Sequence, residues 1–259
     1  MAQVFQPSAN TISRLSLGGL VAVPGLLLVT LSGITRSSYN TKVDVPLDQP
    51  VPFSHQHHAL ELGIDCRYCH STVEKSPVAG VPPTHTCMSC HSQIWTNSPL
   101  LEPVRQSYRT LSPIKGADGE PGWNRINSVP DFVYFNHAIH INRGINCNIC
   151  HGPVQQMQLT YKGQAFFMSW CLDCHRNPEK AIYKDSDPKY KDLSPREQVF
   201  NLYWKAQSLP SHELTYRDRA LLSGKDYNPS AEELEKGEAI AKDLGVKKDQ
   251  LTDCWTCHR

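Results

Sequence analysis

One five-residue pattern recurs five times in this chain and constrains it more than any other feature. Each copy reads Cys-x-x-Cys-His, and together the copies use all ten cysteines of the 259 residues. This pattern is the attachment signature of c-type haem. We number the copies motifs 1 to 5 in chain order: Cys66–Cys69–His70, Cys87–Cys90–His91, Cys147–Cys150–His151, Cys171–Cys174–His175 and Cys254–Cys257–His258.

The chemistry of haem attachment explains the spacing. Two thiols one helical turn apart can each form a thioether with a haem vinyl group, and the following histidine then reaches the iron as proximal ligand. Zinc sites, thioredoxin-like redox sites and disulfides also use paired cysteines, but none requires a histidine after the second cysteine in every copy. The sequence therefore predicts five covalent haem c groups, attached through the ten motif cysteines and ligated proximally by His70, His91, His151, His175 and His258.

The composition indicates that something besides hydrophobic side chains fills the core of this protein. Hydrophobic residues make up 39% of the chain, below the usual 45–50% or so for globular proteins. Much of this content lies in one N-terminal run, so the remainder is poor in core-forming side chains. The net charge of +1 argues against nucleic acid as a partner, because a nucleic-acid binder normally carries a basic face.

The N-terminal run predicts a transmembrane helix. Residues 15–34 read LSLGGLVAVPGLLLVTLSGI and carry no charge, and a helix of this length spans roughly the 30 Å of a bilayer core. A cleaved signal peptide usually has an apolar region of only about 7–15 residues, and LSGITRSS is a poor cleavage site. We interpret 15–35 as an uncleaved signal-anchor helix. Haem c is attached outside the bacterial cytoplasm, so we expect one pass through the inner membrane, with the haem domain in the periplasm.

An internal repeat organises the haem motifs. Residues 53–70 read FSHQHHALELGIDCRYCH and residues 135–151 read FNHAIHINRGINCNICH, with one extra spacer residue in the first copy. A second motif follows each copy. The predicted parts are a cytoplasmic tail (1–14), the anchor (15–35), a first di-haem module (36–95), a connecting loop rich in Pro, Gly and Ser (96–129), a second di-haem module (130–178) and a helical C-terminal segment with the fifth haem (179–259).

Secondary-structure signals are helical, and no strand pattern stands out. Ser194 followed by Pro195 and Glu197 predicts a helix to about Ala206, and Ser230 opens a second one that stops at Gly245. A short helix, 247–253, leads into the last motif. We expect a mainly α protein with extensive loops, packed around five haems, with one transmembrane helix.

Each iron needs a sixth ligand unless it is left open for chemistry. The repeat selects His55 and His58 in one copy and His137 and His140 in the other, as distal ligands. A spacing of three residues places each pair on one face of a helical turn, so the two members serve different irons. His57 breaks the register. For the fifth iron the residues leave four candidates open: Met168, Met157, His85 and His212.

The chain resembles the pentahaem cytochrome subunit of alternative complex III, a bacterial quinol-oxidising complex. The likeness is carried by the N-terminal anchor, HALELGIDCRYCHSTVEKSPVAGVPPTHTCMSCH (58–91), PDFVYFNHAIH (130–140), MSWCLDCHRNPEK (168–180) and LTDCWTCHR (251–259), and covers essentially the whole chain. The resemblance implies a periplasmic haem wire with mostly His/His irons and one His/Met iron, hence Met168 or Met157. It also implies partners: an iron–sulfur subunit, polytopic quinol-site membrane subunits, a monohaem cytochrome and a soluble electron acceptor.

Three functions remain to be compared. The first is electron relay from a quinol-oxidising membrane complex to a periplasmic carrier or terminal oxidase, without substrate chemistry in this chain. The second is a pentahaem nitrite reductase, but that family has a lysine as one proximal ligand, and all five motifs here end in histidine. The third is a free-standing membrane-anchored quinol dehydrogenase that feeds a periplasmic reductase. One anchor helix provides little surface for a quinol pocket, which favours the relay.

Overall fold

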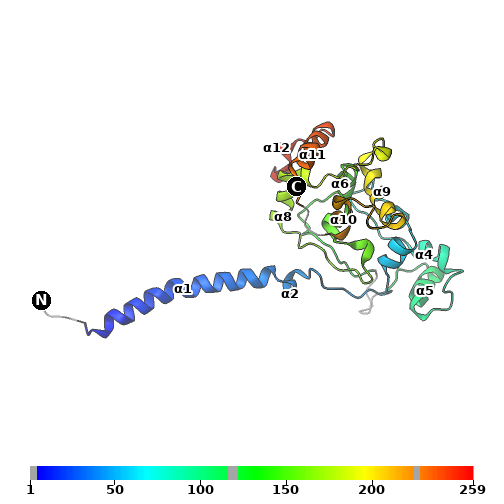
Figure 1. Cartoon of the computed structure of the whole chain (residues 1–259). Helices are drawn as coiled ribbons and strands as arrows, with labels where there is room; N and C mark the ends of the chain where they lie inside the picture. The colour runs from blue at the N-terminus through cyan, green and yellow to red at the C-terminus, as the bar shows by residue number, and fades with distance from the viewer. Residues whose placement is uncertain (1–4, 116–121, 225–227, 259) are drawn as a thin grey trace. The chain divides into compact units, whose positions relative to one another are not determined.

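The computed structural model describes residues 5–115, 122–224 and 228–258, and the chain divides into two compact units, 1–44 and 45–259. In the first unit α1 (Ser8–Arg36) runs through Pro24 without interruption and is followed by α2 (Ser38–Thr41) (Figure 1). No side chain of α1 is buried, and the helix is long and apolar enough to cross a membrane. It therefore fits a single-pass anchor and begins before the predicted 15–35.

The second unit consists of short helices joined by long loops. Its described residues contain no strand, only the isolated bridges Pro46–Tyr161 and Ile145–Ile182. The prediction of a mainly α fold with extensive loops is confirmed. The helical segments are η1 (Gln56–Glu61), α3 (Cys66–Cys69), α4 (Thr84–His91), η2 (Pro99–Leu101), α5 (Glu102–Thr110), α6 (His137–Asn142), α7 (Cys147–His151), η3 (Val154–Gln156), α8 (Met168–Arg176), η4 (Pro178–Lys180), η5 (Pro188–Tyr190), α9 (Pro195–Ser208), α10 (Tyr216–Ser223), α11 (Ala231–Asp243), α12 (Lys248–Leu251) and α13 (Cys254–Cys257).

The helices of the C-terminal segment begin at the predicted caps. Ser194 forms a capping box with Glu197 at the start of α9, and Ser230 forms one with Glu233 at the start of α11. Both helix predictions are confirmed. Helix α10 was not predicted, although Thr215 and Asp218 make the same reciprocal box at its start. The final short helix, α12, spans only four of the seven residues predicted for it.

The prediction that 96–129 is only a connecting loop was wrong for residues 99–110, which form η2 and α5. Two of the prolines that suggested a loop, Pro99 and Pro103, stand in first turns, where a missing N–H has no helical partner to lose. Val104 of α5 is buried, and motif 2's Cys87 packs against the cluster to which Val104 belongs. Burial of this apolar face against the second motif therefore stabilises a helix that composition alone does not predict.

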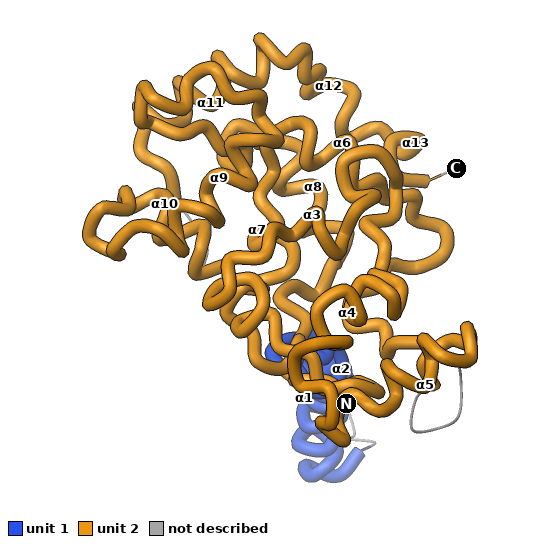
Figure 2. The backbone as a smooth tube through the Cα atoms, turned by 90° about the vertical axis from the view of Figure 1, so that its right-hand side faces the viewer, with its two compact units in different colours: residues 1–44 blue, residues 45–259 orange. Residues whose placement is uncertain are grey.

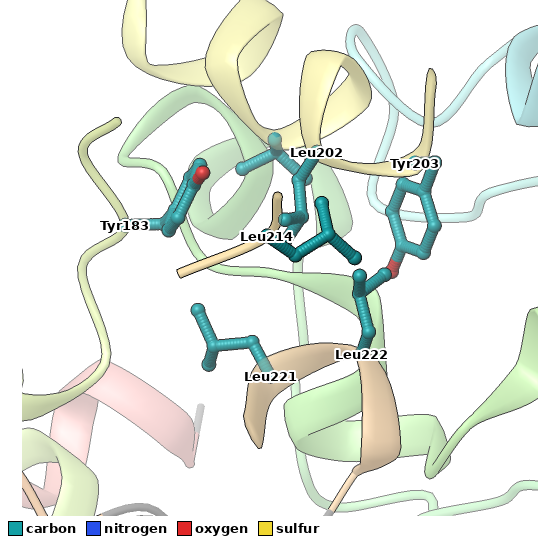
Figure 3. Packing of buried hydrophobic residues seen from close by; sticks show 7 residues of the cluster. Tyr183, Leu202, Tyr203, Leu214, Leu221 and Leu222 are labelled. Carbon is teal, nitrogen blue, oxygen red and sulfur yellow. The ribbon is translucent and has the colours of Figure 1, made fainter. Parts of the chain in front are cut away.

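The largest hydrophobic cluster lies where α9 and α10 meet α7 (Figure 3). Cys66 and Cys147, the first cysteines of motifs 1 and 3, pack against this cluster. In Figure 2, α3 and α7 lie in the middle of the unit, α4 and α5 towards one end, and α12 at the other. The cluster members are Tyr183, Val199, Leu202, Tyr203, Leu214, Leu221 and Leu222.

Candidate haem-binding site

Each of the five motifs forms a helical turn, within α3, α4, α7, α8 or α13. The turn brings the two cysteines of a motif to the same side of the backbone, as attachment to one porphyrin edge requires. In the first motif of each repeat a short polar side chain fixes the start of the turn. Asp65 accepts a hydrogen bond from the N–H of Arg67, and Asn146 accepts one from the N–H of Asn148. None of the ten cysteines, all of which lie in the described residues, forms a disulfide.

Four of the motif histidines each face one histidine of the repeat. His70 faces His55 with ring centres 6.5 Å apart, and His91 faces His58 at 6.2 Å. The corresponding pairs in the second repeat are His151 with His137 and His175 with His140, both at 6.2 Å. The ring planes are 6° apart in the pairs of motifs 1 and 3 and 22° apart in that of motif 4, but 67° apart in that of motif 2.

This separation is the one that two axial imidazoles on a single metal would have. A metal–imidazole bond is about 2.0–2.1 Å long and the ring centre lies roughly 1.1 Å beyond the bound nitrogen, which places opposed ring centres about 6.2–6.4 Å apart. The part of the chain that the structure describes holds no group of three or more His, Cys, Asp or Glu residues able to bind a metal ion. Two opposed imidazoles therefore fit an iron whose equatorial ligands belong to a porphyrin.

Hydrogen bonds to backbone carbonyls leave the second ring nitrogen available in six of these eight histidines and in His258 of motif 5. A backbone carbonyl oxygen only accepts, so an Nδ1 beside it must carry the proton, and Nε2 then keeps its lone pair. Orientation of this kind is typical of metal-ligating histidines. The Nδ1-to-carbonyl pairs are His58 with Ser54, His70 with Gly80, His91 with Ile94, His137 with Pro77, His140 with Asn136, His175 with Leu251 and His258 with Phe132, at 2.7–3.2 Å.

Comparison with known proteins agrees with this geometry. No family model matches the chain. A curated relative, the multihaem cytochrome c subunit of menaquinone reductase from Nitratidesulfovibrio vulgaris, is 31% identical over 150 residues, which cover 50% of this chain and 69% of the relative. The chain is a multihaem cytochrome c. Membership of this family implies covalently bound haem c.

The repeat of this cytochrome is geometric as well as sequential. Phe53 stacks on the His58 ring at 4.5 Å and meets the His55 ring edge-on at 5.0 Å. Phe135 has the same arrangement, stacked on His140 at 4.5 Å and edge-on to His137 at 4.8 Å. The recurrent Phe-x-His-x-x-His pattern therefore fixes the orientation of both imidazoles relative to one aromatic ring.

The extra spacer residue of the first copy is absorbed by a local change of helix type. The first copy forms the π-helix η1, in which the N–H of Leu62 bonds to the carbonyl of His57, five residues earlier. The second copy forms the α-helix α6 over the corresponding histidines. After the extra residue, the backbone N–H of Ile64 donates to the carbonyl of His58. The N–H of Ile145 donates in the same way to the carbonyl of His140, so both copies approach their haem motif with the same hydrogen bond.

Burial lowers the pKa of five facing histidines, His55, His58, His137, His140 and His151, and so favours the neutral form in which imidazole binds a metal. The pKa of His55 is lowered to about 4, first by burial and then by the nearby His70 and His58 rings. The pKa of His151 is lowered to about 4 by burial and by His137, His70 and His55. Since these four rings influence one another, the pairs belonging to motifs 1 and 3 lie close together.

The motif thiols are also crowded in specific pairs. Burial raises the pKa of Cys66, and the neighbouring Cys147 adds to the rise. Burial likewise raises the pKa of Cys150, with Cys174 as the next cause. The pKa of Cys171 is raised by burial and by Cys257. Thiols from different motifs are therefore near neighbours.

Motif 5 has a different environment, because its histidine faces an aromatic ring. His258 lies 5.7 Å from Phe132, at 30°. Met168 is largely exposed at the start of α8, which packs against α12 next to motif 5. Met157 is 2% exposed and lies beside Gly152, directly after motif 3. The structure leaves His57, His85 and His212 exposed and without an opposed motif histidine.

The groups that hold the ligand rings in orientation are mostly backbone carbonyls, which were not predicted. The carbonyls of Gly80, Pro77, Leu251 and Phe132 accept from histidines up to 126 residues away. A backbone carbonyl leaves no residue-type signal, so a sequence pattern does not reveal it. The repeated phenylalanines did give a signal, since they recur two residues before the first histidine of each copy.

Proposed function

We propose that this chain is a membrane-anchored pentahaem cytochrome c that relays electrons between a quinone-reactive membrane complex and a periplasmic carrier or terminal oxidase. The observation that carries the proposal is the set of four opposed histidine pairs. Each pair joins one motif histidine to one repeat histidine at the separation of two axial ligands. Every one of these four irons then has both axial positions filled by protein, which suits outer-sphere electron transfer and excludes a substrate.

The pairs support one distal ligand for each of these four motifs. His55 serves motif 1, His58 motif 2, His137 motif 3 and His140 motif 4, opposite His70, His91, His151 and His175. In every motif the two cysteines attach the porphyrin covalently. When bound, haem iron supplies reversible one-electron redox chemistry. The opposed side chains would hold each iron in position.

For motif 5 we propose Met168 as the distal ligand opposite His258. Met168 begins α8, and α8 packs against α12, which leads into motif 5. Met157 is the poorer candidate, because its buried side chain packs against Gly152 beside His151, and the motif 3 iron is already faced by His137. Methionine in place of histidine raises the reduction potential of an iron. Motif 5 would then hold the iron of highest potential.

α1 supports the membrane part of the proposal. It is long and apolar enough to span a bilayer, and Arg14 and Arg36 lie near its two ends. Because haem c is attached outside the bacterial cytoplasm, the haem motifs support a periplasmic location for residues 45–259. The chain would therefore hold its haem domain at the surface of the inner membrane, within reach of membrane partners.

The resemblance to the alternative complex III subunit supports a place in a quinol-oxidising complex, beside an iron–sulfur subunit, polytopic quinol-site subunits and a monohaem cytochrome. The curated relative is a subunit of menaquinone reductase, which favours a second candidate. In that candidate, electrons cross the chain in the opposite direction and reduce a membrane quinone. Both candidates use the same ligands and differ in partner and direction.

Detergent extraction of native membranes tests the relay. We expect a haem-stained band on a native gel that contains this chain together with an iron–sulfur protein and polytopic membrane subunits, identified by peptide sequencing. Isolation of the chain alone, still reduced rapidly by added quinol, would contradict the relay and support the free-standing quinol dehydrogenase.

The direction of electron flow is measured on the same complex. Quinol addition should reduce the haems within the turnover time if the complex oxidises quinol. If pre-reduced haems are instead oxidised by added quinone while quinol leaves oxidised haems unchanged, the quinone-reducing candidate is correct. Absorbance at the haem α-band reports both reactions.

A further inference from the structure

The contacts among the motifs establish which motifs are neighbours, beginning with motifs 1 and 2. The hydroxyls of Tyr68 and Ser89 are hydrogen-bonded at 2.8 Å, and each stands between the two cysteines of its motif. His55 and His58, which face motifs 1 and 2, lie three residues apart at the start of η1. Cys87 of motif 2 also packs against a hydrophobic cluster whose members lie at residues 51, 101–114 and 123. In the described residues, this cluster contains no member of motif 3, 4 or 5.

Motif 1 is also the neighbour of motif 3. Cys66 and Cys147 pack against the same two hydrophobic clusters. The loop after motif 1 orients a histidine of both motifs. The carbonyl of Gly80 accepts a hydrogen bond from His70 of motif 1, and that of Pro77 accepts one from His137, which faces motif 3, both at 2.7 Å. The two repeats therefore meet through their first motifs.

Motif 3 leads to motif 4, and motif 4 to motif 5. His137 and His140, which face motifs 3 and 4, both lie on α6. Ile149 of motif 3 and Cys174 of motif 4 pack against one cluster. The last link is the bond from His175 Nδ1 to the carbonyl of Leu251, 2.9 Å long, at the end of the helix that leads into motif 5.

The central contact relates equivalent positions of the two repeats. Cys66 and Cys147 are both the first cysteine of their copy, so the two copies meet at equivalent positions. Figure 2 shows α3 and α7 in the middle of the unit and α4 towards one end.

From these contacts we infer that electrons cross the chain in the order motif 2, 1, 3, 4, 5 or the reverse, so that motifs 2 and 5 are the two ends of the path. The inference rests on the proposed function and adds the path and its ends. Each transfer moves one electron: one ferrous iron becomes ferric, the next ferric iron becomes ferrous, and no proton or bond is exchanged. The donor and acceptor are the quinol-linked partner and the soluble carrier proposed above.

The crossed ring planes of His58 and His91 make the order measurable. The electron paramagnetic resonance (EPR) signal of a low-spin ferric haem depends on the angle between its axial imidazoles, so the motif 2 iron should have a signal separate from the near-parallel pairs. Reduction removes the unpaired electron of an iron, and the signal of a neighbouring ferric iron then changes in line shape. A His58→Met variant, which abolishes the crossed pair, identifies the signal.

Two variants separate the inferred order from the order of the sequence. His55→Met and His137→Met raise the potentials of the motif 1 and motif 3 irons, so that these are reduced before the irons that keep two histidine ligands. We expect reduction of the motif 1 iron to change the EPR signal of the motif 2 iron, and reduction of the motif 3 iron to leave that signal unchanged. If the motifs were instead neighbours in the order of the sequence, motif 2 would lie beside both motif 1 and motif 3. Reduction in either variant would then change the EPR signal of the motif 2 iron. A changed signal in His137→Met, or an unchanged one in His55→Met, overturns the inference. His212→Met is the matched control.

Haem counting by mass spectrometry keeps this test apart from the proposed function. Fewer than five haems in the unaltered chain would contradict the pentahaem proposal itself, whereas five haems in another order would contradict only the path. If the variants fail to load haem, a density map of the loaded chain, from crystals or from particles of its complex, gives the order directly. Any contact sequence other than 2, 1, 3, 4, 5 in that map overturns the inference.

Discussion

The imidazole rings of His137 and His151 lie parallel, with 6.2 Å between their centres and 6° between their planes. His137 begins α6, whereas His151 ends α7, and the loop between them turns through Gly144 at a φ of +81°. This φ lies in the left-handed region, which glycine adopts without strain. The opposed rings are thus a product of tertiary folding within one repeat.

Removal of a distal ring should open one iron to an external ligand. We expect His137→Ala, with five haems retained, to bind carbon monoxide at the motif 3 iron after reduction, because no protein group then fills that axial position. The matched control is His212→Ala, whose side chain is 80% exposed and which should bind no more carbon monoxide than the unaltered chain. Equal binding by the two variants would contradict the assignment of His137.

Loss of one motif should remove one haem. Replacing both Cys254 and Cys257 by alanine should lower the mass of the chain by one haem and leave four attached, because thioether bonds need the thiols. The control Trp255→Ala changes a 77% exposed side chain between these cysteines and should keep all five. A five-haem mass for the double cysteine variant would show that motif 5 is not an attachment site.

A buried charge cluster beside the core should be indispensable for stability. The Lys205 ammonium lies 3.1 Å from the Asp185 carboxylate and 3.0 Å from that of Asp218, and all three side chains are at most 6% exposed. Lys205→Met leaves two uncompensated buried carboxylates, which costs about 3–5 kcal/mol of unfolding free energy. The surface variant Lys236→Met should leave the denaturation midpoint unchanged. Circular dichroism during denaturant titration measures both.

Acid should weaken the same cluster. Burial by itself would raise the pKa of Asp218, but hydrogen bonds from Tyr183 and Lys205 outweigh it and the pKa lies below its usual value. A carboxylate with a lowered pKa contributes stability above about pH 4, and that contribution is lost as the pH falls through the folded-state value. We expect the Tm to decline below about pH 4, and to decline less in Asp218→Asn. Parallel acid profiles of the two proteins would refute a role for Asp218.

The packing of α11 onto η4 should tolerate no methyl group at Gly237. A Cβ at this position would lie 2.4 Å from the backbone oxygen of Glu179, so the helix must move outward. Although alanine favours helix formation, we expect Gly237→Ala to destabilise the fold by about 1–3 kcal/mol. Glu235→Ala, on the exposed side of the same helix, should change stability by less than about 0.5 kcal/mol. Similar midpoints for the two variants would contradict the close approach.

Local spacing alone predicted the features that depend on near neighbours in the chain. The helical turn from Cys66 to Cys69, the anchor helix and the caps at Ser194 and Ser230 each involve only a few consecutive residues or one apolar run. The repeat likewise indicated which four histidines would turn towards the motifs. Helix α5 escaped prediction, because its formation depends on burial of Val104 beside Cys87 rather than on its own sequence.

Tertiary structure decided how these parts are combined. The facing of His140 and His175, the bond from His137 to Pro77 and the meeting of Cys66 with Cys147 join residues 35 to 81 positions apart. Such contacts arise from the burial of loops and helix ends against a shared core, and no local pattern specifies them. The sequence by itself determined how many haem motifs the chain has and which histidine follows each. Only the folded chain determined which histidine lies opposite and which motifs are neighbours, because both depend on packing between segments distant in sequence.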